Sequence, residues 1–270
     1  MTELIILALA GFTVGTLGTL IGAGGGFIMV PVLLLAYPSL PPAVITAISM
    51  AVVALNAISG SIAYARARRI DFKAGVLFAL YTIPGSVLGV FTVQHISVAL
   101  FHVLFGILLL LLAVYLFMKK SGPANASAHT VGGHATTITD RHGVSYTYSY
   151  DRRKGIVISI LVGFFSPVLG IGGGIIHVPA MVQLLHFPMH IATATSHFIL
   201  AVMATVTVVT HAVNGSYTDH HVQMMILGLC LGVIPGAQLG AYLSHRLHSD
   251  LIIRLLAISL ALVGLRMLVL

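Results

Sequence analysis

Two glycine-rich stretches interrupt apolar segments and are the first candidates for chemistry. The chain reads LIGAGGGFIMVPVL at residues 20–33 and LGIGGGIIHVPAMV at residues 169–182. Glycine permits the backbone angles of a sharp turn, and a proline suits the first turn of the helix that follows. Such a helix begins with free N–H groups and a positive dipole end, which attract anions. We therefore expect anion-binding helix ends at Gly24, Gly25, Gly26, Gly172, Gly173 and Gly174.

Hydroxyl side chains follow each glycine stretch at matching positions. TAIS contains Thr46 and Ser49, and TATS contains Thr193 and Ser196. Hydroxyl groups in membrane helices can simply bond the preceding turn or join neighbouring helices. Their matched recurrence favours the alternative, a set of neutral donors to a bound anion.

Two histidines break the symmetry between these stretches. His177 stands where the first stretch has Met29, and His197 stands where the first half has Met50. Histidines inside a membrane are candidates for function, because they can donate to an anion or carry a coupled proton. The alternative is a core histidine with satisfied hydrogen bonds, and this applies more strongly to His211, which matches Tyr64.

The elements that hold these residues are membrane helices. The 270 residues are 58% hydrophobic and 7% charged, whereas soluble domains carry about 25% charged residues. Apolar runs long enough to span a bilayer cover most of the chain: 4–37, 43–65, 74–92, 98–118, 155–185, 191–213, 222–243 and 251–270. Continuous apolar blocks such as residues 104–117 exclude a β-barrel, whose strands alternate. We predict an all-α polytopic membrane protein.

Residue types exclude several other functions. The single Cys230 lies in an apolar run, so no disulfide framework or thiolate metal site is expected. The net charge of +7 comes from Lys and Arg in loops between spans, which is typical of topology determinants and not of a nucleic-acid surface. Hardly any charge lies inside the spans, which argues against a cation pump built on intramembrane Asp or Glu. We expect no cofactor and no metal.

The order of motifs indicates an internal duplication. Gly22, Gly24–Gly26 and Pro31 recur 148 residues later, and IPGSVLG (83–89) recurs as IPGAQLG (234–240). We expect close helix packing through the small residues of the IPG motifs. The predicted divisions are an N-terminal repeat of four apolar segments (1–120), a polar linker (121–153) and a C-terminal repeat of four apolar segments (154–270).

The first segment of each repeat is too long for one span. Residues 4–37 as one helix would measure about 50 Å, against about 30 Å for the hydrocarbon core, so the helix must break at the glycines. If the chain returns to its starting side, the repeats are inverted, and all Lys and Arg except Arg266 share one side. A parallel arrangement would move Arg246 and Arg254 to the other side. We therefore predict inverted repeats with 8–10 membrane elements, each repeat holding a glycine-broken or re-entrant first helix and three spans.

The linker has its own pattern. TTITDRHGVSYTYSYD alternates around a DRHG turn, which predicts a β-hairpin. His129, His134 and His142 could bind a metal, but their irregular spacing and the lack of a carboxylate pattern favour a solvated cytoplasmic hairpin.

The doubled motifs GAGGGFIMVP…TAIS and GIGGGIIHVP…TATSH resemble the TauE/SafE family of membrane transporters, also called the sulfite exporter family. The resemblance covers both halves outside the linker. It implies a carrier of small sulfur-containing or organic anions, such as sulfite, sulfoacetate or thiosulfate-like species, in the bacterial cytoplasmic (inner) membrane. It implicates the glycine motifs and the polar segments after them.

The sequence thus predicts a secondary transporter of small anions, with export favoured over uptake, that binds its substrate at the helix ends after the glycine breaks. The alternative is an anion channel whose pore the same turns line. The chain contains no P-loop, so ATP hydrolysis is not supported, and we expect no enzyme activity. The expected partners are the anion and the lipid bilayer, with no nucleic acid; coupling to protons through histidine and export down the membrane potential are alternatives. Coupling and oligomeric state stay open.

Overall fold

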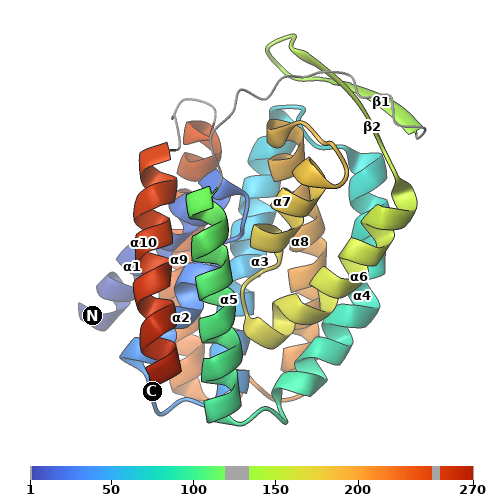
Figure 1. Cartoon of the computed structure of the whole chain (residues 1–270). Helices are drawn as coiled ribbons and strands as arrows, with labels where there is room; N and C mark the ends of the chain where they lie inside the picture. Colours follow the sequence, from blue (N-terminus) through green and yellow to red (C-terminus); the bar gives the residue numbers. More distant parts are fainter. Residues whose placement is uncertain (1, 119–133, 245–249, 270) are drawn as a thin grey trace.

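The computed structural model describes residues 2–118, 134–244 and 250–269. Two sets of five helices within these ranges form one bundle, with a β-hairpin across one end (Figure 1). The elements are α1 (Thr2–Ile21), α2 (Gly26–Ala36), α3 (Pro42–Arg66), α4 (Phe72–Val93), α5 (Val98–Met118), β1 (His134–Thr139), β2 (Ser145–Tyr150), α6 (Arg152–Leu169), α7 (Gly174–Gln183), α8 (Met189–Val213), α9 (His220–Leu243) and α10 (Asp250–Val269). Part of the predicted linker (residues 121–133, with His129) lies outside the described residues, as do Lys119, Lys120 and Arg246.

The first helix of each half is broken and re-entrant. The α2 helix returns to the side of the bundle where α1 begins, since the hydroxyl of Tyr37 after α2 donates to Glu3 at the start of α1, at 3.3 Å. In the second half, Phe187 after α7 packs against Tyr150 just before α6, with ring centroids 4.9 Å apart. Each broken pair therefore reaches the middle of the bundle and turns back.

The two halves have opposite orientations. From the side where α1 begins, α3 crosses to the far side, and α4 therefore starts there. The α6 helix starts beside α4 and runs parallel to it, because Gly155 packs on Phe78 at their beginnings and Gly89 packs on Pro167 near their ends. Consequently α6 enters from the side opposite to α1. The predicted all-α fold with inverted repeats is confirmed. We call the side that carries β1 and β2 the hairpin side.

Six helices in the described part of the chain are long and apolar enough to cross a membrane: α1, α3, α4, α5 (residues 98–115), α8 and α9. The outer surface carries large exposed apolar side chains, such as Leu111 and Leu262. A soluble monomer rarely exposes so much contiguous apolar surface, so this surface faces lipid. The chain is a multi-pass membrane protein.

Glycines bring the helices of the two halves into close contact. A Cβ on Gly236 of α9 would lie 3.1 Å from the carbonyl carbon of Phe12 in α1 and closer still to its carbonyl oxygen. One on Gly85 of α4 would lie 2.7 Å from the backbone nitrogen of Phe164 in α6. No side chain fits at these positions, so the small residues of the IPG motifs act as helix-packing residues.

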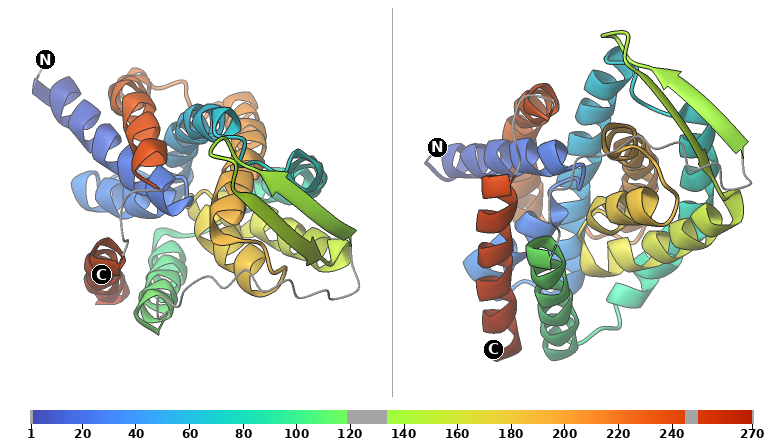
Figure 2. Two further views of the ribbon diagram at one scale, coloured as in Figure 1. Left: turned by 90° about the horizontal axis from the view of Figure 1, so that it is seen from above. Right: turned by 45° about the horizontal axis from the view of Figure 1, so that its top comes forward.

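The hairpin packs on the bundle through one face. Strands β1 and β2 are antiparallel, with His134 opposite Tyr150 and Thr139 opposite Ser145. Tyr148 and Tyr150 are buried and contact Phe187, and Tyr150 also packs edge-on against Phe78. Seen from the hairpin side, the strands lie across the ends of the helices (Figure 2). The hairpin therefore covers part of the bundle and does not stand free in solvent.

Candidate functional site

The two glycine clusters form left-handed turns between the helix pairs. The first turn has positive φ angles at Gly22, Gly24 and Gly25, between 77° and 84°. The matching residues of the second turn, Gly170, Gly172 and Gly173, have φ between 66° and 81°. Residues with a Cβ rarely adopt these angles, so the spacing of the glycines directly specifies both chain reversals.

The two turns touch each other inside the bundle. A Cβ on Gly26 would lie 2.7 Å from the carbonyl carbon of Ile171 and closer still to the carbonyl oxygen of Gly170. Reciprocally, a Cβ on Gly174 would lie 2.8 Å from Cα of Ala23 and would meet the carbonyl oxygen of Gly22. A contact that does not admit a methyl group does not admit an oxyanion. In this conformation the space between the turns is therefore closed, although both predicted helix N-termini are present.

The hydroxyl groups after the turns divide into different roles. The Ser49 hydroxyl donates to the carbonyl oxygen of Gly170 at 2.6 Å and so ties α3 to the second turn. The Thr46 hydroxyl bonds its own helix, at the Ala43 carbonyl. The matching Ser196 hydroxyl is buried and finds no hydrogen-bond partner among the described residues.

A polar network supports the first turn. The amide of Asn56 donates to the Gly24 carbonyl at 2.9 Å, and the Thr19 hydroxyl donates to the Asn56 amide oxygen at 2.9 Å. The Tyr64 hydroxyl donates to the Thr19 carbonyl, also at 2.9 Å. His197 joins through Nε2, 3.3 Å from the Thr19 hydroxyl oxygen. Because the Thr19 hydroxyl proton points to Asn56, Nε2 is the donor in this contact. The second half contributes His197 to the environment of the first turn.

His177 lies in a different part of the bundle. It is buried on α7, with Nε2 3.4 Å from the hydroxyl of Ser159 in α6. Its ring packs edge-on against Phe78 of α4, with centroids 6.3 Å apart. Two histidines that look alike in sequence therefore have different side-chain neighbours. The His197 ring joins the network of the first turn, whereas His177 bonds the second turn only through its backbone N–H, to the Gly173 carbonyl.

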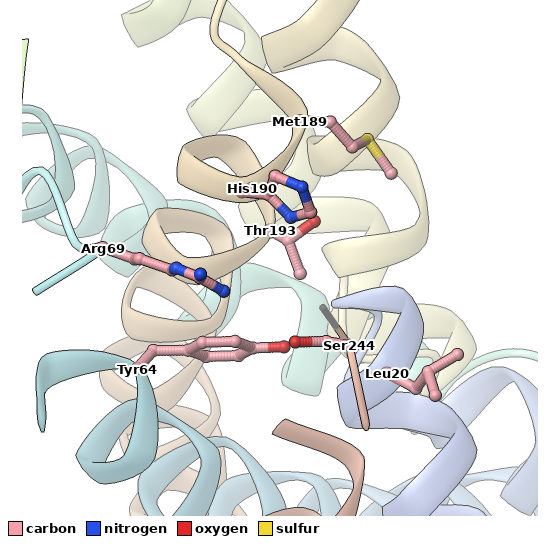
Figure 3. Close-up of a pocket in the computed structure, with 7 residues that line it drawn as sticks. All are labelled: Leu20, Tyr64, Arg69, Met189, His190, Thr193 and Ser244. Carbon is pink, nitrogen blue, oxygen red and sulfur yellow. The ribbon is translucent and has the colours of Figure 1, made fainter. Parts of the chain in front are cut away.

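A cavity of about 120 Å³ opens next to the first turn, on the hairpin side. Figure 3 shows side chains from α1, α3 and α8, from the α3–α4 connection and from the residue after α9 around it. Its lining residues are Leu20, Tyr64, Arg69, Met189, His190, Thr193 and Ser244. Of the predicted site residues, Thr193 is in this lining. It also touches Gly22, since a Cβ on Gly22 would lie 3.2 Å from Cα of Thr193. The cavity thus extends from the hairpin side to the first turn.

The cavity has a positive wall. The guanidinium of Arg69 lies beside Tyr64 and points towards His190 and Thr193 (Figure 3). Arg69 is 6% exposed, and its Nε has no hydrogen-bond partner within the described part of the chain. Met189 and His190 are the first two residues of α8, so that helix directs its positive dipole end to the same place. The guanidinium pairs with the Asp140 carboxylate through Nη2, at 3.1 Å, so its unpaired Nε and the dipole end of α8 are what favour an anion here.

Sequence reasoning missed Arg69, Tyr64, His190 and Ser244 as lining residues. Arg69 belongs to the basic cluster ARARR, which we interpreted as a topology determinant. Arg66 and Arg68 of that cluster are exposed, whereas a left-handed turn at Arg68 (φ 56°) brings Arg69 back into the bundle. The cluster itself contains no signal that separates one arginine from the others. As for metal ions, no three His, Cys, Asp or Glu side chains of the described ranges are grouped to hold one.

Comparison with known proteins agrees with this architecture. The family model described as sulfite exporter TauE/SafE matches residues 7–267. The chain belongs to the TauE/SafE family. This TauE/SafE protein is similar to the probable membrane transporter protein YunE of Bacillus subtilis (strain 168), with 34% identity over 96% of this chain and 95% of the relative. A probable membrane transporter protein of Methanocaldococcus jannaschii is 31% identical over 71% of this chain and 66% of its own length.

No solved structure matches this chain. The family and the names of the relatives point to membrane transport of a small molecule.

Proposed function

We propose that this TauE/SafE protein is a secondary transporter of small oxyanions, which reach their binding site at Arg69 from the hairpin side. The observation that carries the proposal is the buried Arg69 guanidinium on the cavity wall, with an unpaired Nε. Buried polar groups in native proteins almost always have a partner, and an oxyanion supplies several acceptors to a guanidinium. The positive dipole end of α8 adds to this attraction.

The size of the cavity supports a small substrate. Its volume of about 120 Å³ is well below the roughly 300–1,000 Å³ of sites for drug-sized ligands. Sulfite and similar sulfur-containing or short organic oxyanions fit this class, as the family description suggests. Larger anions with extended apolar parts do not.

Export across the bacterial cytoplasmic membrane follows from the distribution of charge. The basic residues Arg66, Arg68, Lys73, Arg152 and Arg153 flank the hairpin side, and cytoplasmic loops collect Lys and Arg. The cavity then faces the cytoplasm. Moving one negative charge out of an inside-negative cell releases about 2.3 kcal/mol per 100 mV, so export needs no second ion.

We infer a transporter and not a channel because the two glycine turns close the centre of the bundle. The anion loads beside the first turn, and passage requires the turns to separate as the inverted halves rearrange. Thr193 and His197 then line the route, because both lie on α8 next to the first turn, and we place Ser196, between them on the same helix, with them.

The test is flux of labelled sulfite in proteoliposomes, together with thermal shift of the purified protein against sulfite, sulfate, thiosulfate, sulfoacetate, taurine and lactate. Binding to the folded state raises the melting temperature. Sulfite flux should saturate, and unlabelled anion on the opposite side should accelerate it. Ohmic single-channel currents would instead show the channel.

Arg69→Gln should abolish both binding and flux, whereas Arg68→Gln, the same change at an exposed neighbour, should leave both near wild type. Arg69→Gln leaves the buried carboxylate of Asp140, 3.1 Å from Arg69 in the wild type, without its cationic partner. An unpaired buried charge is itself destabilising. The double variant Arg69→Gln/Asp140→Asn removes both charges and keeps the test valid. Normal sulfite binding in this double variant would refute the assignment of the site.

A further inference from the structure

The hairpin places a carboxylate beside Arg69, the residue to which we assign substrate binding. Asp140, directly after β1, places Oδ2 3.1 Å from Nη2 of Arg69. The two side chains are 1% and 8% exposed, respectively. A carboxylate resembles a small oxyanion, because both are negatively charged and accept hydrogen bonds through oxygen. The guanidinium that would bind substrate is thus already engaged at Nη2 by an anion belonging to the protein, while its Nε is unpaired.

Asp140 is oriented by its own turn. Its Oδ1 accepts the backbone N–H groups of His142 at 2.8 Å and Val144 at 3.0 Å. These bonds leave Oδ2 to face Arg69. The adjacent N–H of Arg141 donates to the carbonyl of Ala67, in the α3–α4 connection, at 3.0 Å. An ion pair and a backbone hydrogen bond therefore help to hold the tip of the hairpin on the bundle.

A separate set of contacts holds the base of the hairpin. The Tyr148 hydroxyl donates to Oδ2 of Asp71 at 2.7 Å, and the rings of Tyr148 and Tyr150 pack on Phe187. These contacts do not involve Arg69. Loss of the ion pair at the tip would therefore leave the hairpin attached through β2.

We propose that the Asp140 carboxylate is a tethered competitor of the transported anion, which occupies Arg69 when the cavity is empty and gives way when substrate binds. The inference rests on the proposed function. It makes Asp140 a determinant of affinity and selectivity. An anion must replace a carboxylate that is already bound, so anions with several strong acceptor oxygens succeed where weakly accepting ones such as chloride do not.

The test compares sulfite affinity in the wild type and in Asp140→Asn, measured by thermal shift and by the half-saturation of flux. Asparagine keeps a carbonyl oxygen for the N–H groups of His142 and Val144, so the turn stays intact, but it removes the charge. A hydrogen bond to a charged group is worth about 1.5–3 kcal/mol. Releasing Arg69 from that bond should thus tighten sulfite binding about tenfold or more. Chloride should become a detectable inhibitor in the variant.

Asp151→Asn is the matched control. Asp151 is an exposed aspartate that caps α6, and its Oδ1 accepts the N–H of Arg153 at 2.9 Å. This variant loses the same charge on the same side of the protein without touching Arg69, so its sulfite affinity should stay within about twofold of wild type. If sulfite affinity rose as much in Asp151→Asn as in Asp140→Asn, the cause would be the lower negative charge on this side of the protein and not the release of Arg69. That result would overturn the proposal.

The outcomes separate the two proposals. If Asp140→Asn binds sulfite as the wild type does, or more weakly, while Arg69→Gln/Asp140→Asn does not bind it, Arg69 remains the site and the competitor role of Asp140 is wrong. If the double variant binds sulfite normally, the site assignment itself fails. Tighter binding in Asp140→Asn together with loss in the double variant supports both.

Discussion

The contact between the two glycine turns makes Gly26→Ala the sharpest test of the fold at the centre of the protein. Gly26 is the first residue of α2 and has no positive φ, so alanine suits its backbone. The added methyl group, however, would meet the carbonyl groups of Gly170 and Ile171. These atoms belong to the backbone of a turn and cannot rotate away. The substitution must therefore push the two turns apart.

The expected cost follows from two opposing terms. Overpacking a well-packed interior costs typically 1–3 kcal/mol, and rigid backbone partners place this site at the upper end. Alanine recovers about 0.5–1 kcal/mol relative to glycine within a helix. The net loss is about 2 kcal/mol, which corresponds to a fall of about 4–8 °C in melting temperature for a chain of this size.

The single cysteine provides the assay. Cys230 is buried in α9, so a thiol-reactive fluorophore labels it only when the protein unfolds, and a heating curve in detergent gives the melting temperature. Gly174→Ala, the matching change in the second half, should cost a similar amount. The double variant should cost less than the sum, because both methyl groups separate the same pair of turns.

Gly143→Ala is the control for glycine substitution in general. Gly143 has φ of 81°, and no atom lies within 4 Å of the position of its Cβ. It therefore carries only the left-handed backbone cost of about 1–2 kcal/mol, at the tip of a hairpin. A melting temperature of Gly26→Ala within 1 °C or so of wild type would mean that the turns do not touch in the protein, and the closed centre of the bundle would be wrong.

Three further predictions concern the side chains around the site. His177→Met, which installs the residue of the first half, should leave sulfite affinity within about twofold of wild type, because His177 contacts Ser159 and Phe78 and does not line the cavity; a tenfold loss would place His177 on the route. Tyr148→Phe removes the hydrogen bond to Asp71 and should cost about 1.5–3 kcal/mol of stability, whereas Tyr146→Phe on the same strand should cost far less; equal effects would contradict the role of the bond. Burial alone raises the pKa of Asp140, but the N–H groups of Val144 and His142 and the guanidinium of Arg69 lower that pKa below its ordinary 3.8. A carboxyl whose pKa is lowered in the folded state contributes stability above its unfolded pKa and loses this contribution as the pH falls through its folded pKa. The difference in melting temperature between wild type and Asp140→Asn should therefore stay constant from about pH 8 to 5 and shrink only below about 3.8. A difference that already changes near neutral pH would contradict the pairing.

Much of the architecture follows from local sequence. The length of the first apolar segment and its glycine cluster require a chain reversal, because one helix of that length exceeds the bilayer and only glycine adopts the left-handed angles found at Gly24 and Gly25 at low cost. The duplication places a second reversal 148 residues later. The distribution of Lys and Arg then orients the two halves. All of these are properties of neighbouring residues or of whole loops, which a sequence displays directly.

The candidate site depends on contacts between residues that are distant in sequence. Arg69 cannot be distinguished from Arg66 and Arg68 by type or by neighbours, and its burial requires the turn at Arg68 and a partner 71 residues away, Asp140. His177 and His197 replace methionines in the same way. One faces α6 and the other faces the first glycine turn, because α7 and α8 pack on different helices. Sequence by itself determined two inverted, glycine-broken repeats, while tertiary packing alone decided that the turns close on each other and that the positive cavity lies beside them.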